Sequence, residues 1–146
     1  MPIEYRIDHA SHRVLAEGYG KVTDEDVFVY QREVWSRSDV QGYDELVDMS
    51  DATTIEEGSS DRMRELAALS AAADPPQGSS RFAIVAPGDL AFGVGRMYQA
   101  YRQLNDRTTK QVAVFREREA AIRWLDGEEP APGDSIPAPP RRDPPT

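Results

Sequence analysis

The stretch Leu46-Val47-Asp48-Met49-Ser50-Asp51 decides the fold of this chain. Its apolar residues surround a single Asp48 and the run then turns polar, which is the pattern of a short buried strand with a polar carboxyl end. One helical pattern precedes this strand and three more follow it. We therefore predict that residues 46–51 form the central strand of an α/β domain, with any functional site at the carboxyl end of that strand.

Two further strands are predicted before it. Apolar and charged residues alternate over residues 3–8, which is the period of a half-buried strand, and apolar residues resume at Val14. This pair predicts an N-terminal antiparallel hairpin. Gly18 and Gly20 follow in the second strand, where glycine permits a bulge.

The rest of the chain alternates between helical and strand patterns. Thr23-Asp24-Glu25-Asp26 has the spacing of a capping box and begins a helix that runs to about residues 36–38. After a loop over residues 52–58, strands are predicted at residues 81–86 and 111–115. Further helices are predicted from Ser59–Asp61 to Pro75, from a cap at Asp89 to a left-handed stop at Asn105, and from Glu117 to Leu125, closed by Gly127. The apolar residues that share a face of the third helix are Val94, Met97, Tyr98, Tyr101 and Leu104.

Such alternation is typical of parallel strands joined by right-handed crossovers. The predicted fold class is therefore α/β, with an N-terminal antiparallel hairpin followed by βα units. These elements make a five-stranded, mostly parallel sheet with four helices.

The composition narrows the classes of function. The net charge is −9, and no basic cluster occurs outside Arg141-Arg142, so nucleic-acid binding is disfavoured. The absence of cysteine excludes disulfides and thiolate metal sites, and no apolar run is long enough to span a membrane. We expect a soluble, cytoplasmic protein with one domain at residues 1–127. Residues 128–146 contain seven prolines and are predicted to form a disordered tail.

Three stretches resemble the SpoIIAA-like branch of the STAS superfamily: Leu46–Asp51, Leu90–Tyr98 and the ending from Val114 to Leu125. The resemblance covers roughly residues 3 to 125. It implies a β–α superhelix like that of anti-sigma factor antagonists, with four helices flanking the sheet and the first strand antiparallel at its edge. STAS domains are typically non-enzymatic, so the resemblance implies a role in regulation or protein contacts.

The best-known members are switched by phosphorylation of a serine in an Asp-Ser-Ser-Gly-like segment at a helix start. The matching region here is Gly58-Ser59-Ser60-Asp61, in which the glycine precedes the serines and an acid follows them. A phosphate there would gain from the helix N-terminus and be repelled by the acid. The candidates for an interaction or phospho-switch surface are Ser50, Asp51, Ser59 and Ser60.

Some SpoIIAA-like proteins are grouped by shape with CRAL-TRIO-type lipid-binding domains. That grouping implies an apolar cavity between the helices and the sheet. The candidate pocket residues are the helical aromatics Trp35, Phe92, Tyr98 and Tyr101. Such side chains are equally what an ordinary core contains.

Glycines and histidines supply two weaker patterns. Gly93-Val94-Gly95 has part of a dinucleotide-binding fingerprint but lacks its third glycine, so helix-packing glycines are favoured. Arg96, close to the amides of residues 89–91, is a candidate for anion binding. His9 and His12 could bind a metal weakly with Asp8, but their spacing fixes no third strong ligand, so we predict solvated turn residues and no metal site.

Carboxylates and prolines supply two more weak patterns. Asp48 and Asp51, with Glu56-Glu57 after them, could do acid–base chemistry or hold a divalent cation. Turn chemistry is favoured, with Asp48 accepting hydrogen bonds from loop amides and Asp51 opening a turn. Residues 137–142 fit a polyproline recognition ligand, although a flexible tail is the preferred interpretation.

The sequence thus predicts a non-enzymatic STAS-like regulatory or protein-interaction domain without a cofactor. The alternative is a binding or carrier domain for a small apolar or lipid-like ligand, and an enzyme is the third hypothesis. A protein partner or self-association is expected, because glycine-rich and aromatic helix surfaces often pack on copies of themselves.

Overall fold

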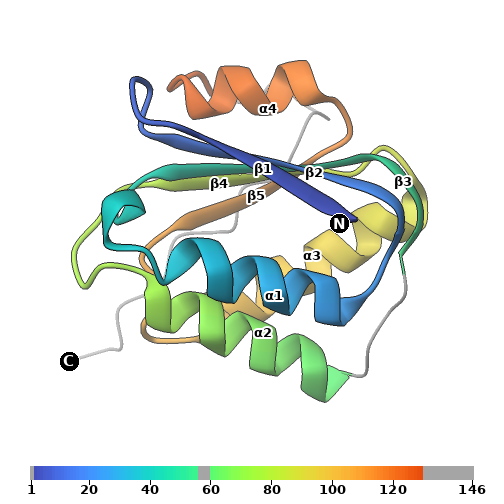
Figure 1. The fold of residues 1–146 in the computed structure, drawn as a ribbon, viewed down its shortest axis with the longest axis horizontal. Helices are drawn as coiled ribbons and strands as arrows, with labels where there is room; N and C mark the ends of the chain where they lie inside the picture. The colour runs from blue at the N-terminus through green and yellow to red at the C-terminus, as the bar shows by residue number, and fades with distance from the viewer. Residues whose placement is uncertain (1, 56–59, 130–146) are drawn as a thin grey trace.

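A five-stranded sheet forms the centre of the protein (Figure 1). The computed structural model describes residues 2–55 and 60–129. The strands lie side by side in chain order, with β1 antiparallel to β2 and all other neighbours parallel. They are β1 (Ile3–Asp8), β2 (Arg13–Val22), β3 (Asp44–Ile55), β4 (Arg81–Val85) and β5 (Gln111–Phe115). The predicted hairpin, the mostly parallel sheet and the central place of residues 46–51 are confirmed.

The helices cover the two faces of the sheet unequally. They are α1 (Asp24–Trp35), α2 (Ser60–Ala73), α3 (Asp89–Leu104) and α4 (Arg118–Leu125), with a short 3-10 turn η1 (Ser38–Val40). Figure 1 shows α1, α2 and α3 on one face and α4 on the other. Each of the first three connects one parallel strand to the next in the same direction, so the fixed handedness of such crossovers places them together.

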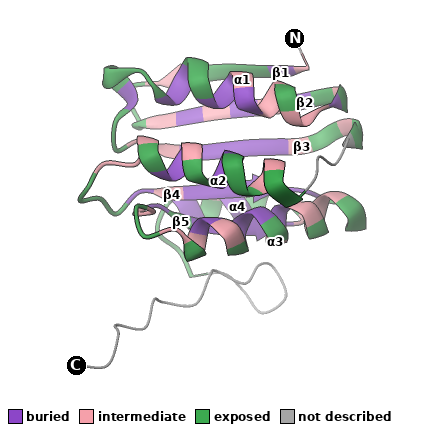
Figure 2. Cartoon of the chain, turned by 90° about the horizontal axis from the view of Figure 1, so that it is seen from below, coloured by how far each residue is buried: buried purple, intermediate pink, exposed green. Residues whose placement is uncertain are grey.

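The core accordingly has two layers. Side chains of a strand alternate between faces, so Val47 joins the cluster beneath α1–α3 while its neighbour Leu46 joins the cluster beneath α4. Figure 2 shows the resulting buried band along β3 and β4. None of the helices within the described ranges is long and apolar enough to cross a bilayer.

β3 is longer than predicted. Residues 52–55, expected in a loop, continue the strand because they pair with residues 20–22 of β2. Asp51 pairs with Tyr19 instead of opening a turn, so that prediction was wrong. The predicted irregularity at Gly20 is confirmed, since the register shifts beside it and its φ is +59°. Residues 56–58, the rest of the predicted loop, lie outside the described residues.

Two helix ends were predicted correctly and two caps were not. Gly127, with φ +102°, closes α4 directly after the C-cap Asp126. The backbone N–H of Asp26 donates to Thr23 Oγ1 at 3.2 Å and that of Thr23 donates to Asp26 Oδ2 at 2.9 Å, which completes the capping box. Gly88, not Asp89, is the N-cap of α3. Asp89 accepts a hydrogen bond from Arg116 instead, at 2.7 Å. Asn105 has an extended backbone with φ −90°, so it is not a left-handed stop.

The buried face of α3 also differs from the prediction. Met97 is 41% exposed and Leu104 is 77% exposed. The buried residues are Gly95, Tyr98, Gln99 and Arg102. α3 approaches β5 so closely that a Cβ on Gly95 would lie 3.0 Å from Val114, and specific polar partners satisfy the other side chains. These contacts determine which face of α3 turns toward the sheet.

Candidate functional site

A pocket of about 130 Å³ lies between the sheet and the helices α1, α2 and α3. Its walls are mostly apolar and come from every strand except β5. The apolar side chains of these walls are Ile3, Val22, Val47, Met49, Phe82 and Ile84 from the strands and Leu66 from α2. A concave, mostly apolar pocket of this kind is a typical binding site for a small molecule.

The mouth of the pocket lies at the N-termini of the three helices. The partly exposed lining residues of the helices lie in or beside their first turns, whereas Phe28, Gln31, Leu66, Ser70 and Tyr98 farther along are buried. The partly exposed residues are Thr23, Asp24, Val27, Arg62, Met63, Ala91 and Val94. In this fold, helix N-termini follow the carboxyl ends of the parallel strands. The pocket thus opens at the sheet edge where the sequence predicted a site.

The charged groups at the mouth are dominated by carboxylates. Arg62 of α2 is 3.1 Å from Asp24 and 3.1 Å from Glu25, both on α1, and 3.2 Å from Glu65. Its guanidinium also lies 4.1 Å from the centre of the Phe28 ring. The hydrogen bond to Asp24 is the main cause that raises the pKa of Arg62. Arg32 also lies 3.0 Å from Glu25, so two cations meet three carboxylates and a small excess of negative charge is left at the mouth.

The deep end of the pocket is polar, and Glu45 is its centre. Its carboxylate accepts hydrogen bonds from the Tyr30 hydroxyl at 2.7 Å, from Trp35 Nε1 at 3.0 Å and from Lys110 Nζ at 3.4 Å. Lys110 also lies 3.3 Å from the centre of the Trp35 ring, a cation–π contact. Burial is the main cause that lowers the pKa of Lys110 and raises the pKa of Tyr30.

A second buried ion pair supports this floor. Arg102 of α3 donates to Asp74 at 2.6 Å and to the Tyr98 hydroxyl at 2.8 Å. Burial alone would lower the pKa of Arg102, but Tyr98 and Asp74 outweigh it and raise that pKa. Asp74 also accepts from the backbone N–H of Thr109 and of Lys110. The two pairs together hold equal numbers of positive and negative charges.

Gln31 and Ser70 complete the lining of the floor. The Ser70 hydroxyl donates to Gln31 Oε1 at 3.0 Å, and the Gln31 side chain is buried, with only 8% of the residue exposed. The structure gives the Gln31 amide nitrogen no hydrogen-bond partner among the described residues. This nitrogen is not one of the fully buried atoms that lack a partner, so it stays accessible, and it belongs to a pocket-lining residue.

Of the predicted pocket aromatics, only Tyr98 lines the pocket. Trp35 lies behind the floor and donates to Glu45. The Phe92 ring lies 4.1 Å from the Arg116 guanidinium, and the Tyr101 ring lies 5.4 Å from that of Arg64. Both rings therefore make cation–π contacts outside the pocket. Arg96 donates to Gln99 at 2.6 Å, and its predicted anion binding stays a prediction.

The predicted switch residues lie apart from the pocket lining. Ser50 and Asp51 are exposed on β3, and Ser60 is the exposed first residue of α2. Ser59, Glu56 and Glu57 lie outside the described residues, as do residues 130–146 of the predicted tail with its polyproline segment.

Asp48 is engaged on the α4 side of the sheet. It accepts from the Ser50 backbone N–H at 2.9 Å and from Arg118 at 2.9 Å, so the predicted backbone donor is present but belongs to β3 and not to a loop.

The two histidines lie at the β1–β2 turn. His9 Nδ1 is 2.8 Å from the Tyr43 hydroxyl, and the His12 ring lies 5.1 Å from the Tyr43 ring. In residues 2–55 and 60–129, no group of three histidine, aspartate or glutamate side chains is placed to hold a metal ion.

Sequence reasoning missed the polar floor. Glu45 and Lys110 were passed over because each stands at the entry of a strand, where a charged residue normally reaches solvent. One signal could have found Glu45: it directly precedes the buried run that begins at Leu46. Nothing local marks Gln31 or Ser70.

Comparison with known proteins supports the fold. No family model and no curated protein sequence matches this chain. A solved structure with 17% sequence identity aligns with a TM-score of 0.54, covering 84% of this chain and 93% of the other. It is an uncharacterised protein of the DUF3478 family with a SpoIIAA-like fold, from Shewanella loihica PV-4. The chain therefore has a SpoIIAA-like fold, as predicted.

Proposed function

We propose that this protein binds a small, uncharged, largely apolar molecule that carries one hydrogen-bonding group, and that it does so without catalysing a reaction. The observations that carry the proposal are the largely apolar pocket and, at its deep end, the Gln31 side-chain amide, whose nitrogen makes no hydrogen bond to the described residues and is not sealed from solvent. A polar group of a ligand would satisfy that donor. The alternative function predicted from sequence, a carrier of an apolar ligand, thereby becomes the leading one.

The pocket sets the size of the enclosed group. An apolar cavity of about 150 Å³ holds benzene, so a cavity of about 130 Å³ accepts an apolar body of similar size. A longer ligand could extend through the mouth past Met63. Removing apolar surface from water supplies the driving force, about 25 cal/mol for each Å² buried.

The charges near the pocket favour an uncharged ligand. On the floor, Glu45 already accepts from three donors, so a cationic ligand would find its carboxylate engaged. At the mouth, three carboxylates face two arginines, and the small excess of negative charge disfavours an anion. Burying an unpaired charge in such a place costs several kcal/mol, roughly, which a neutral group avoids.

The same contacts argue for binding rather than catalysis. Glu45 is held by its donors at the bottom of the pocket, and Asp48 faces α4 on the other side of the sheet, paired with Arg118. The histidines stand at the hairpin turn beside Tyr43. The acid–base groups that do gather at the floor, Glu45, Tyr30 and Lys110, are bonded to one another, which favours a structural role for them over catalysis.

A titration with three matched probes tests the proposal. Phenol, toluene and benzoate share a six-membered ring and differ in carrying a hydroxyl, a methyl or a negative charge. Nuclear magnetic resonance should show saturable shifts in pocket residues with phenol, affinity about three- to tenfold weaker with toluene because one hydrogen bond is missing, and no binding of benzoate at pH 7. Preferred binding of benzoate would contradict the proposal.

Two variants localise the binding. Met63→Trp at the mouth should abolish phenol binding by filling the entrance, whereas Met97→Trp, on the exposed face of α3 outside the pocket, should leave it unchanged. Gln31→Leu should reduce the preference for phenol over toluene. Equal effects of the two tryptophan substitutions would show that phenol binds elsewhere.

A regulatory or protein-interaction domain is the second candidate. The observation that favours it is the outer edge of β1, which pairs with no strand other than β2 in the part of the chain that the structure describes and exposes Glu4, Tyr5 and Arg6. Ser60 at the N-terminus of α2 is also exposed, so its hydroxyl could be phosphorylated. Mass spectrometry of protein from native cells would test that modification, and an unmodified Ser60 under all growth conditions would count against the switch.

A further inference from the structure

β1 is an edge strand whose outer side is open. Figure 2 shows it at the margin of the sheet, and β2 is its one strand neighbour in the described part of the chain. The Tyr19 backbone N–H donates to the Pro2 carbonyl at 2.6 Å, so the backbone groups of Pro2 face β2. In an antiparallel pair this direction alternates, so the N–H and C=O groups of Ile3, Tyr5 and Ile7 point outward.

We propose that two copies of this chain associate through these edges, with the two β1 strands antiparallel about a twofold axis at Tyr5. In this register Tyr5 faces Tyr5 of the second copy, and Ile3 faces Ile7 of the second copy. All the outward-pointing backbone groups are then used, which gives roughly six hydrogen bonds between the copies. The two sheets become one continuous sheet, and the twofold axis closes the assembly as a dimer.

The charges on β1 select this register. Glu4 and Arg6 are exposed, and neither forms an ion pair in the structure's described ranges. With the axis at Tyr5, each Glu4 lies directly opposite Arg6 of the other copy. Two neighbouring registers, with the twofold axis at Glu4 or at Arg6, also pair outward-pointing backbone groups of the two copies. They place Glu4 opposite Glu4 or Arg6 opposite Arg6, which is unfavourable. The strand is therefore complementary to itself in one register.

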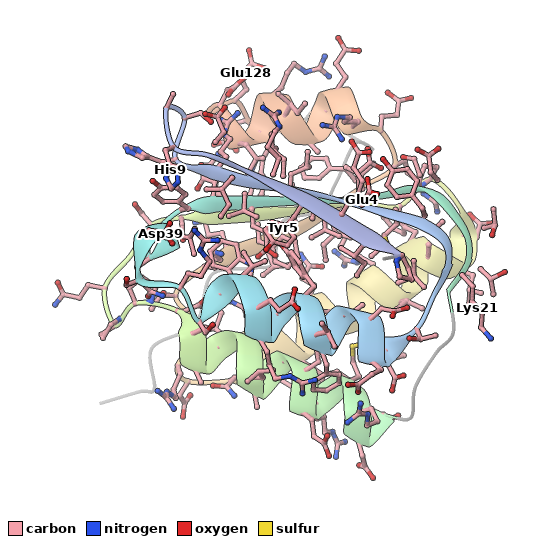
Figure 3. All side chains as sticks on the ribbon, in the orientation of Figure 1. Glu4, Tyr5, His9, Lys21, Asp39 and Glu128 are labelled. Atoms are coloured by element: carbon pink, nitrogen blue, oxygen red, sulfur yellow. The ribbon has the colours of Figure 1, made fainter. Side chains whose placement is uncertain are left out.

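The surroundings of β1 leave room for a second copy. Alternation along the strand places Glu4 and Arg6 on the α4 face of the sheet, because Ile3 lines the pocket on the other face. α4 packs mainly on β3, β4 and β5, so no helix in residues 2–55 and 60–129 covers this face of β1. On the helical side, Tyr5 is 39% exposed and its ring lies 6.3 Å from Tyr30. The positions of Glu4 and Tyr5 on β1 can be followed in Figure 3.

Charge reversal at two positions tests the dimer. Sedimentation equilibrium at low salt should show a dimer for the wild type. Glu4→Arg and Arg6→Glu should each weaken association by about tenfold or more, because the twofold axis makes every substitution act twice. The double variant Glu4→Arg/Arg6→Glu should restore the dimer, since each position again faces the opposite charge.

Controls make every outcome decisive. Glu33→Arg changes the same charge at an exposed position of α1 and should leave the dimer intact. Circular dichroism of each variant separates loss of association from loss of folding, and the double variant carries both changes in one chain. A monomeric wild type, single variants that dimerise normally, or a double variant that stays monomeric would each overturn the proposal. Failure of ligand binding would leave it untouched.

Discussion

The buried pair of Glu45 and Lys110 gives the sharpest prediction about stability. Both side chains are 3% exposed, and the carboxylate also accepts hydrogen bonds from Tyr30 and Trp35. The two partners therefore differ in what each leaves behind when it is removed. We expect Glu45→Leu to destabilise the protein clearly more than Lys110→Met does.

The magnitudes follow from the contacts. Glu45→Leu leaves a buried ammonium without its counter-charge and the Tyr30 hydroxyl without its acceptor, whereas Trp35 Nε1 keeps the Tyr30 oxygen at 3.2 Å, so we expect a loss of about 3–5 kcal/mol. Lys110→Met keeps an unbranched apolar chain against Trp35 and leaves a carboxylate that still accepts two hydrogen bonds. That carboxyl group can also take up a proton, so we expect a loss of about 1–2 kcal/mol.

Urea unfolding followed by far-ultraviolet circular dichroism measures both free energies without relying on the fluorescence of Trp35. The double variant should lose less than the sum of the two single losses, with a coupling energy of about 0.5–3 kcal/mol. Equal losses from the two single substitutions, or a larger loss from Lys110→Met, would refute the assignment of Glu45 as the centre of the floor.

Three further outcomes are expected. Arg102→Leu leaves the buried Asp74 carboxylate without its guanidinium and should cost about 3–5 kcal/mol in urea unfolding, and a loss below 1 kcal/mol, roughly, would contradict the pairing. Burial raises the pKa of Tyr30 above its ordinary value of 10.0, so the folded state holds a proton that the unfolded state releases. The stability from this group is present below pH 10 and is lost as pH rises further, so Tyr30→Phe should show a smaller alkaline loss of melting temperature than the wild type. Thr23→Ala removes the side-chain acceptor for the Asp26 N–H and should cost about 1 kcal/mol, whereas no change would show that the capping box contributes nothing.

The elements of this fold could be predicted because each has a local signal. The capping box at Thr23 and the alternation over residues 3–8 depend only on neighbouring residues, and both are confirmed. The length of β3 could not be predicted, since residues 52–55 are held by pairing with β2 rather than by their own pattern.

Helix α3 shows the limit of predicting a buried face from helical periodicity. The pattern in α3 predicted an apolar face that includes Met97 and Leu104, yet Gln99 and Arg102 are buried instead. The Gln99 amide donates to the Val112 carbonyl at 2.7 Å, and Arg102 pairs with Asp74 beyond the end of α2. Because these partners are distant in sequence, one helix read alone cannot reveal which face they turn inward.

A crystal structure of the protein soaked with 4-bromophenol tests the central claim most directly, because the anomalous signal of bromine locates and orients the molecule. We predict the ring inside the pocket, its hydroxyl oxygen about 3 Å from the Gln31 amide nitrogen and its bromine directed toward Met63 at the mouth. A bromine peak on the protein surface alone, or a reversed orientation with bromine at the floor and the hydroxyl at the mouth, would contradict the account.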